Sequence, residues 1–161
     1  MNMAGISAAD RRVAVEAQKR AKETGGPAAA LELDDGRIVT GKTTNLLGAS
    51  AALLLNVLKL LAGIRHEDHI ISPESIEPIQ KLKVDYLKSR NPRLHTDEVL
   101  IALSASAASN PEARLALSQL PKLNGCQAHT SVILSDVDIK IFKKLGVQLT
   151  CEAIYEHILL S

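Results

Sequence analysis

An apolar run from Leu46 to Ala62 is the feature that most constrains the fold. It reads LLGASAALLLNVLKLLA and places apolar residues on nearly every face of a helix. A helix that is apolar all round is buried, so the run predicts a central helix packed against a sheet and ended by Gly63. Asn56 and Lys59 interrupt the run, which makes it a poor candidate for a membrane span.

The segments around this helix predict a sheet and further helices. Asp-Gly at 35–36 lies between the short apolar runs AAALEL and RIVT, which indicates a β-hairpin. Near the C-terminus, AHTSVILS, DVDIKIFKKLG and VQLTCEA have the patterns of a strand, a helix and a strand, and we expect the two strands to be parallel. Further helices are predicted over residues 8–24, 73–87, 96–108 and 111–119.

Polar residues suited to helix N-caps precede these helices. They are Ser7 with Asp10, Thr43 or Thr44, Ser72, Thr96, Asn110, and Ser135 with Asp138.

The predicted fold class is α/β, with a β-hairpin and a β-α-β unit in one mixed sheet, α+β-like, covered by helices in three layers. The 161 residues fit a single domain over residues 1–161, since a chain of this length buries a sufficient core without staples. The order of elements resembles that of cytidine-deaminase-like domains, and LELDDGRIVTG is similar to their hairpin. That resemblance implies the fold alone, because the zinc-binding motif of those enzymes is missing from the sequence.

The composition argues against several classes of function. Aromatic residues make up 2% of the chain, which leaves no platform for stacking the bases of single-stranded nucleic acid. The 19 basic and 18 acidic residues give a net charge of +1, so no cationic field attracts a phosphate backbone. The first residues lack a secretory signal, and two cysteines are too few for a disulfide framework. We therefore expect a cytoplasmic protein without nucleic-acid or membrane partners.

The segment GRIVTGKT, Gly36 to Thr43, matches the nucleotide-binding pattern G-x-x-x-x-G-K-[ST]. A phosphate-binding loop needs small residues that turn successive backbone N–H groups toward the ligand. The intervening residues Arg37 to Thr40 are mostly β-branched and favour an extended strand. Nucleotide binding is therefore the less favoured interpretation, and Lys42, Thr43, Thr44 and Asn45 stay candidates for binding another ligand at a polar corner.

Two further groups of residues carry possible chemistry. Cys126, His129 and Cys151 supply three zinc ligands if the two C-terminal strands lie side by side, but their spacing matches no zinc signature and no metal site is favoured. No cofactor is predicted.

The stretch SRNPRLHTDEVLIALS holds more polar groups than the start of a helix requires. Asp97 and Glu98 suit the positive end of a helix, while Arg90, Arg93 and His95 are left over. An Arg and a His beside carboxylates bind anions or run acid-base chemistry, and equally tie a loop down by ion pairs. Arg93, His95 and His129 are the catalytic candidates, and Asp97 and Glu98 join the ligand-binding candidates.

The chain resembles the C-terminal part of a bacterial family, domain of unknown function 1846, also called uncharacterised protein family 0371. The similar stretches include DGRIVTGKTTNLLGASAALLLN, NPRLHTDEVLIALSASAASNPEA and LPKLNGCQAHTSVILS. The resemblance implies a much longer family protein with a preceding domain, and it implies no activity.

Two functional hypotheses follow. The first is a non-catalytic module that packs against the preceding domain and against copies of itself, and completes a small-molecule site at that junction. The second is an enzyme, hydrolase-like or a deaminase-fold relative, whose site gathers Lys42, Thr43, Arg93, His95 and His129. Convergence of these side chains in one cleft would favour the enzyme, and their dispersal would favour the module.

Overall fold

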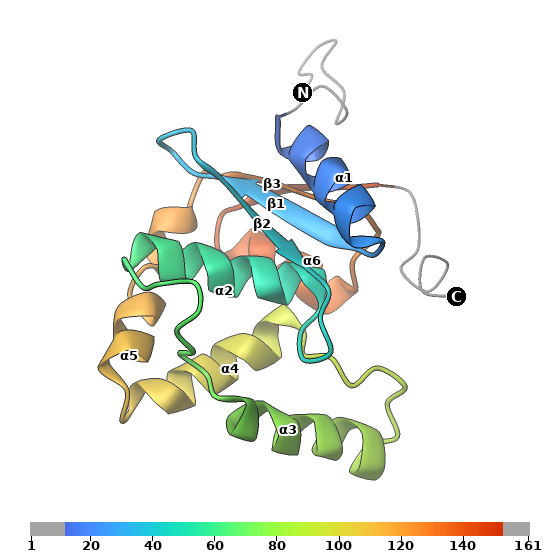
Figure 1. Ribbon diagram of the computed structural model, residues 1–161, viewed down its shortest axis with the longest axis vertical. Helices are drawn as coiled ribbons and strands as arrows, with labels where there is room; N and C mark the ends of the chain where they lie inside the picture. Colours follow the sequence, from blue (N-terminus) through green and yellow to red (C-terminus); the bar gives the residue numbers. More distant parts are fainter. Residues whose placement is uncertain (1–11, 153–161) are drawn as a thin grey trace.

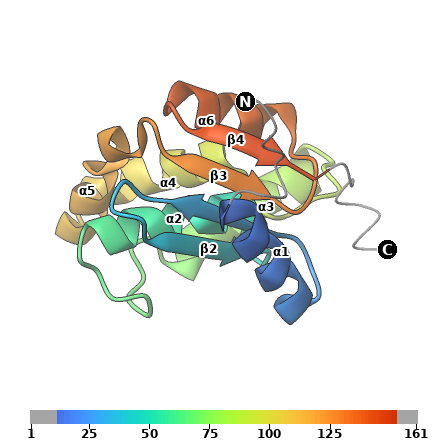
Figure 2. The same ribbon diagram turned by 90° about the horizontal axis from the view of Figure 1, so that it is seen from above.

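A four-stranded mixed sheet forms the centre of the computed structural model, which describes residues 12–152. The strand order is β2-β1-β3-β4, with β1 antiparallel to β2 and β3, and β3 parallel to β4. Figure 2 shows β2 and β4 as the two outer strands. The strands are β1 (Ala28–Glu32), β2 (Ile38–Lys42), β3 (Gln127–Thr130) and β4 (Gln148–Cys151). The predicted hairpin, parallel pair and mixed sheet are confirmed.

The hairpin turn explains the first glycine of the GRIVTGKT segment. Gly36 has a φ of +89°, a left-handed conformation that glycine adopts without strain. Its N–H donates to the carbonyl of Leu33, and the Leu33 N–H donates to the carbonyl of Arg37. The strands then pair in register, with Leu31 opposite Val39 and Glu32 opposite Ile38.

Helices cover both faces of the sheet, as the layers in Figure 1 show. On one face lies α1 (Arg12–Thr24), which packs mainly on β1. On the other face lie α2 (Ala49–Leu61) and α6 (Asp136–Lys144). The β1 residues Ala28, Ala29 and Ala30 are fully buried, and their small side chains let helices approach the sheet closely from both sides. The apolar run at 46–62 is thus the buried central helix that its sequence predicted.

The remaining helices form a further tier beyond α2 and α6 (Figure 1). They are α3 (Pro73–Lys81), a π-helical turn η2 (Leu82–Tyr86), α4 (Thr96–Ala107) and α5 (Pro111–Leu117), and a 3-10 turn η3 (Leu120–Leu123) then leads from α5 back to β3. The helix predicted over 73–87 is therefore α3 and η2 together. The strand predicted over 128–135 is shorter, because the chain leaves the sheet after Thr130 to reach α6. Within residues 12–152, no helix combines the length and apolar character needed to cross a bilayer.

The capping predictions had mixed outcomes. Asn110 caps α5 by accepting from the N–H groups of Glu112 and Ala113, and Ser135 caps α6 by accepting from the Asp138 N–H, as predicted. Ser72 occupies the N-cap position of α3 without a capping hydrogen bond from its side chain. The predicted cap at Ser7 and Asp10 lies outside the described residues.

Two cap predictions were wrong. The N-cap of α4 is His95, and Thr96 is already the first helical residue. The N-cap of α2 is Gly48 rather than Thr43 or Thr44. The Thr44 hydroxyl instead accepts from the N–H groups of Leu46 and Leu47, which organises the loop before the helix. The Thr96 hydroxyl donates to Asp138 of α6 and so does not cap its own helix.

Candidate functional site where three helices begin

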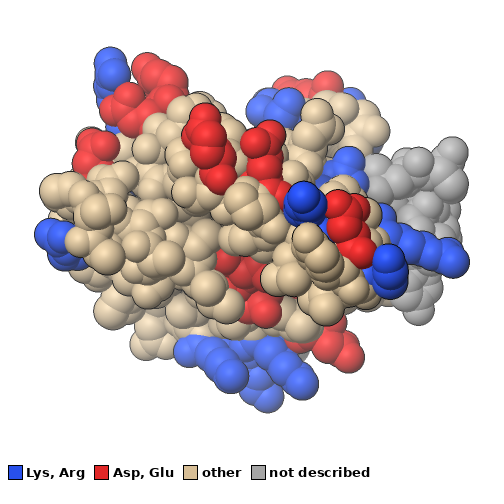
Figure 3. All heavy atoms as spheres, turned by 90° about the horizontal axis from the view of Figure 1, so that it is seen from below, with Lys and Arg blue, Asp and Glu red and all other residues tan. Residues whose placement is uncertain are grey.

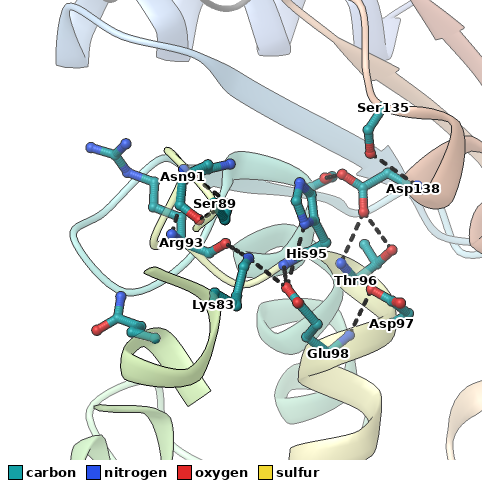
Figure 4. Close-up of polar contacts among 12 residues, drawn as sticks. Lys83, Ser89, Asn91, Arg93, His95, Thr96, Asp97, Glu98, Ser135 and Asp138 are labelled. Atoms are coloured by element: carbon teal, nitrogen blue, oxygen red, sulfur yellow. Dashed lines mark hydrogen bonds and ion pairs between the residues drawn. The ribbon is translucent and has the colours of Figure 1, made fainter. Parts of the chain in front are cut away.

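Helices α2, α4 and α6 begin close together at one end of the sheet. The carboxylate of Asp138, in the first turn of α6, connects all three. One of its oxygens accepts from the backbone N–H of Thr96 at 2.9 Å and from the Thr96 hydroxyl at 2.6 Å. The other accepts from the hydroxyl of Ser50, in the first turn of α2, at 3.1 Å. Figure 4 shows the Asp138 and Thr96 side chains pointing toward each other between α6 and α4.

This arrangement places a negative group where helix dipoles favour one. Helix N-termini carry partial positive charge and unpaired N–H groups, and so they attract anions. Asp138 is 5% exposed and accepts three hydrogen bonds there. The chain thus supplies its own anion at the junction, and Asp138 holds the three helices together.

The cavity beside Asp138 is small. Its volume is about 20 Å³, and its lining includes Gly48, Ser50, His95 and Asp138. A cavity of this size has room for about one water molecule. The junction therefore has no space for a metabolite within this chain.

A second polar cluster fastens η2 to the start of α4. Lys83 is 6% exposed, and its Nζ donates to Glu98 Oε1 at 2.8 Å and to the carbonyl of Arg93 at 2.5 Å. Glu98 also accepts from the backbone N–H of His95 at 2.8 Å (Figure 4). Burial acts to raise the pKa of Glu98, but the hydrogen bonds from His95 and Lys83 outweigh it, and the pKa lies below its ordinary value.

Two loops that are distant in sequence lie side by side here. The Arg93 Nε donates to the carbonyl of Thr44 at 2.6 Å, and the Leu94 N–H donates to the carbonyl of Leu46 at 2.9 Å. The Gly48 N–H returns to the carbonyl of Leu94 at 3.2 Å. The predicted residues Thr44, Arg93 and His95 are therefore brought to one region. Their hydrogen bonds join the loops to each other.

The other predicted ligand-binding residues surround these loops. Lys42 is exposed at the end of β2, and Thr43 is half-buried with its hydroxyl lacking a hydrogen-bond partner among the described residues. Asn45 is exposed, and its carbonyl accepts from the Gln80 side chain at 2.9 Å. Asp97 accepts from the Glu98 N–H at 2.8 Å.

His129 lies away from this region, on the opposite face of the sheet. It pairs with Ala30, whose side chain packs against α1, so the His129 side chain also lies on the α1 side. His129 is fully buried, with Nδ1 2.6 Å from the Thr150 hydroxyl and Nε2 2.5 Å from Glu152. Gln18 of α1 donates to the same Glu152 oxygen at 3.0 Å. The five residues proposed for an enzyme site therefore do not share one cleft.

The three candidate metal ligands are also separated. Side chains alternate between the faces of a strand, so Cys126, which packs in the core on the α2 side, points away from His129. Cys151 pairs with Thr130, which comes four positions after Cys126 in the chain. At strand spacing, this sets the two cysteines about 13 Å apart along the sheet. Among the described residues, no group of three or more His, Cys, Asp or Glu side chains is placed to hold a metal ion.

The nucleotide-binding interpretation of Gly36 to Thr43 meets a different backbone. Ile38 to Lys42 form strand β2, paired with β1 along its whole length. Gly41 is buried against α2, where a Cβ atom would lie 2.3 Å from the backbone nitrogen of Leu53. Gly36 serves the hairpin turn and Gly41 serves helix packing. The segment therefore has no concave loop for phosphates, and its backbone argues against the nucleotide-binding interpretation.

Lys83 and Ser50 are the polar residues of this region that the sequence analysis missed. Lys83 follows Ile76 by seven positions and Ile79 by four, which places it on the apolar side of its helix. A lysine at an apolar position is a signal of a buried ion pair. Ser50 gave no comparable signal within its apolar run.

Comparison with known proteins agrees with the family resemblance noted in the sequence. A family model described as "Domain of unknown function DUF1846, C-terminal" matches residues 9–160. A UPF0371 protein of Corynebacterium efficiens is 60% identical over 157 residues, which cover 98% of this chain and 32% of the relative. A UPF0371 protein of Streptococcus pneumoniae is 50% identical over 157 residues, with the same coverage of 98% and 32%. The chain spans about a third of the length of these relatives. It belongs to the DUF1846 family and corresponds to its C-terminal domain.

Proposed function

We propose that this chain is a non-catalytic assembly module, which docks against the part of a DUF1846 protein that lies outside it. The docking surface is the α3–α4 face, defined here by Ile79, Leu82, Tyr86 and Ile101. The carrying observation is the exposure of large apolar side chains there: Leu82 is 48% exposed, and Tyr86 and Ile101 are each 67% exposed. Exposed apolar side chains gathered on one face are typical of protein contacts.

Helical spacing brings these side chains together. Ile79, Leu82 and Tyr86 recur at three and four positions along α3 and η2, so they form one stripe. Ile79 and Ile101 also line the same groove of about 490 Å³ between α3 and α4. Figure 3 views the molecule from this side and shows a broad uncharged area on its left, with Asp, Glu, Lys and Arg side chains across the middle and right.

The α4 side of the groove suits close packing by another helix or strand. Its lining residues Ala102, Ala105, Ser106 and Ser109 are all small. Small side chains let a partner backbone approach closely, while Ile101 supplies apolar contact area. The relatives contain about twice as much chain outside this portion as within it, which is enough for the proposed partner to belong to the same protein.

The polar residues support a module over an enzyme. His129 is separated from Arg93 and His95, and the cavity beside His95 has a volume of only about 20 Å³. The hydrogen bonds of Lys83, Glu98 and Asp138 connect helices to one another. In this proposal the small-molecule site of the family protein forms at the junction of its two parts, and further copies of the protein associate around it.

The test places glutamate at Ile101 in a full-length relative, at the aligned position. We expect the charge to separate the two parts, which small-angle scattering would detect as a larger radius of gyration and limited proteolysis as faster cleavage between them. The matched control is glutamate at Ile139 of α6, which is 39% exposed and lies outside the α3–α4 face. Equal behaviour of the two variants would refute the proposal.

A further inference from the structure

Strand β2 lies at one edge of the sheet, and its outer backbone groups pair with no other strand of residues 12–152. In an antiparallel ladder, alternate residues direct N–H and C=O toward the neighbouring strand. Thr43 donates to Pro27 and Leu33 donates to Arg37, which fixes the odd-numbered residues of this segment as those facing β1. Ile38, Thr40 and Lys42 therefore direct their backbone groups outward, away from β1.

One side chain covers part of this open edge. Asn56 of α2 donates from Nδ2 to the carbonyl of Thr40 at 3.0 Å, which agrees with an outward direction for that carbonyl. Natural proteins commonly protect sheet edges against pairing. In this edge, Asn56 protects one carbonyl and leaves the outward N–H groups of Ile38, Thr40 and Lys42 without a partner strand among the described residues.

A groove of about 520 Å³ follows the same edge. All residues of β2 line it, and Asn56 and Leu60 of α2 and Ile64 after that helix form its other wall. Leu60 is 40% exposed, so apolar surface is available beside the open backbone. Figure 1 shows β2 running alongside α2 at this border of the sheet. An added strand here would bond to β2 and place alternate side chains against α2.

The groove is basic. Arg20, Lys42, Lys59 and His66 line it, and no Asp or Glu is among its described lining residues. The Nε of Arg20 is buried without a hydrogen-bond partner, although Arg20 Nη1 lies 3.6 Å from Glu23. Lys42 is exposed and has no ion-pair partner among the described residues.

Lys59 is the buried cation of the groove. It is 7% exposed and donates from Nζ to the carbonyl of His66 at 2.5 Å. Burial lowers its pKa, and the nearby carboxylates of Asp68, Glu67 and Glu112 oppose that effect only in part. A cation so desolvated gains from an approaching carboxylate.

We infer that β2 binds an extended acidic peptide of a partner protein as a fifth strand of the sheet. Its main chain pairs with the outward groups of Ile38, Thr40 and Lys42, its apolar side chains contact Leu60, and its carboxylates lie near the cations of the groove. Strand addition of this kind takes affinity from main-chain hydrogen bonds and specificity from alternate side chains. This inference is independent of the α3–α4 face.

The charge of β2 argues against a second copy of the same strand as the occupant. Arg37 precedes β2 and Lys42 ends it, with no acidic residue between them. A second copy of β2 would add cations to a groove that is already basic and would supply no carboxylate. An acidic segment supplies the opposite charge.

The experiment measures fluorescence anisotropy with a labelled peptide of alternating Glu and Val, about six residues long, the usual strand length. The whole chain should bind it, more weakly at high salt, and should not bind the Lys and Val counterpart. Thr40→Pro removes one outward N–H and leaves the bonds to β1 in place, since proline is tolerated at outward positions of edge strands. It should weaken binding roughly fivefold, the effect of one hydrogen bond.

A peptide with proline at its central position provides the second arm, which does not depend on a folded variant. It should bind the wild-type chain at least as weakly as the unmodified peptide binds the Thr40→Pro variant, because proline removes a main-chain donor from the peptide. Lys42→Glu should weaken binding of the acidic peptide, whereas Lys140→Glu on the exposed side of α6 should not. Absence of binding to the wild-type chain, or equal binding of the proline peptide, would overturn the inference. So would dimerisation through β2 that the acidic peptide fails to inhibit.

Discussion

Replacing Gly41 by alanine is the sharpest test of how β2 and α2 fit together. An ideal Cβ on Gly41 would lie 2.3 Å from the backbone nitrogen of Leu53, 2.6 Å from its Cα and 2.9 Å from the carbonyl oxygen of Ala49. All three atoms belong to the backbone of α2, so no side-chain rotation relieves the contact. The helix itself has to move away from the strand.

The expected cost follows from that displacement. Restoring ordinary contact requires α2 to move by about 1 Å, and a close-packed core transmits such a shift to every neighbour of the helix. Inserting a methyl group into a well-packed core costs about 1–3 kcal/mol, and a contact with rigid backbone lies at the upper end. For a chain of this size, a loss of about 3 kcal/mol lowers the Tm by roughly 6–12 °C.

The assay is urea and thermal unfolding followed by circular dichroism, with Gly26→Ala as the matched control. A Cβ at Gly26 would meet nothing within 4 Å, and its φ is outside the left-handed region, so that variant should be neutral or slightly stabilised. Titration with Mg-ATP should give no binding for any of the three proteins. A Gly41→Ala protein as stable as wild type would refute the packing argument. ATP binding that this substitution abolishes would instead restore the nucleotide-binding interpretation.

The remaining predictions concern the junction of the helices and the thiols. Asp138→Ala leaves three buried donors without an acceptor and should cost roughly 2–4 kcal/mol in unfolding free energy, whereas Asp136→Ala, exposed in the same turn, should cost much less. Because the pKa of Glu98 is lowered on folding, its stabilisation is present above the ordinary pKa and is lost as the pH falls through the folded value. Unfolding below about pH 4 should therefore depend less on pH in Glu98→Gln. Burial and then the charge of Asp34 raise the pKa of Cys126, so iodoacetamide should modify Cys126 more slowly than the partly exposed Cys151, as mass spectrometry of the single serine variants can measure.

Local patterns predicted the elements well, because each depends on residues close in the sequence. The apolar run at 46–62 gave the buried helix, and Asp-Gly at 35–36 gave the hairpin. The β-branched residues after Gly36 argued for a strand against the letter match to a nucleotide-binding motif, and β2 forms there. The likeness to cytidine-deaminase-like domains stays a prediction.

The helix starts were harder to predict, because contacts between distant segments decide them. Thr96 has the side chain of a good N-cap, yet its hydroxyl donates to Asp138, a residue of another helix. His95 then takes the N-cap position, and Glu98 accepts from its N–H. Capping preferences describe an isolated helix end, and here three ends share one carboxylate.

The candidate site was likewise predictable only where local patterns decide the structure. The sequence by itself determined the mixed α/β architecture, the buried central helix and the family, because periodicity, turn residues and long matching stretches are all local properties of the chain. The tertiary structure alone decided that Asp138 joins three helices, that His129 faces α1 away from Arg93, and that β2 has an open basic edge. These facts depend on helix packing, on strand order and on which face each side chain occupies, and a one-residue change of register moves every side chain of a strand to the other face.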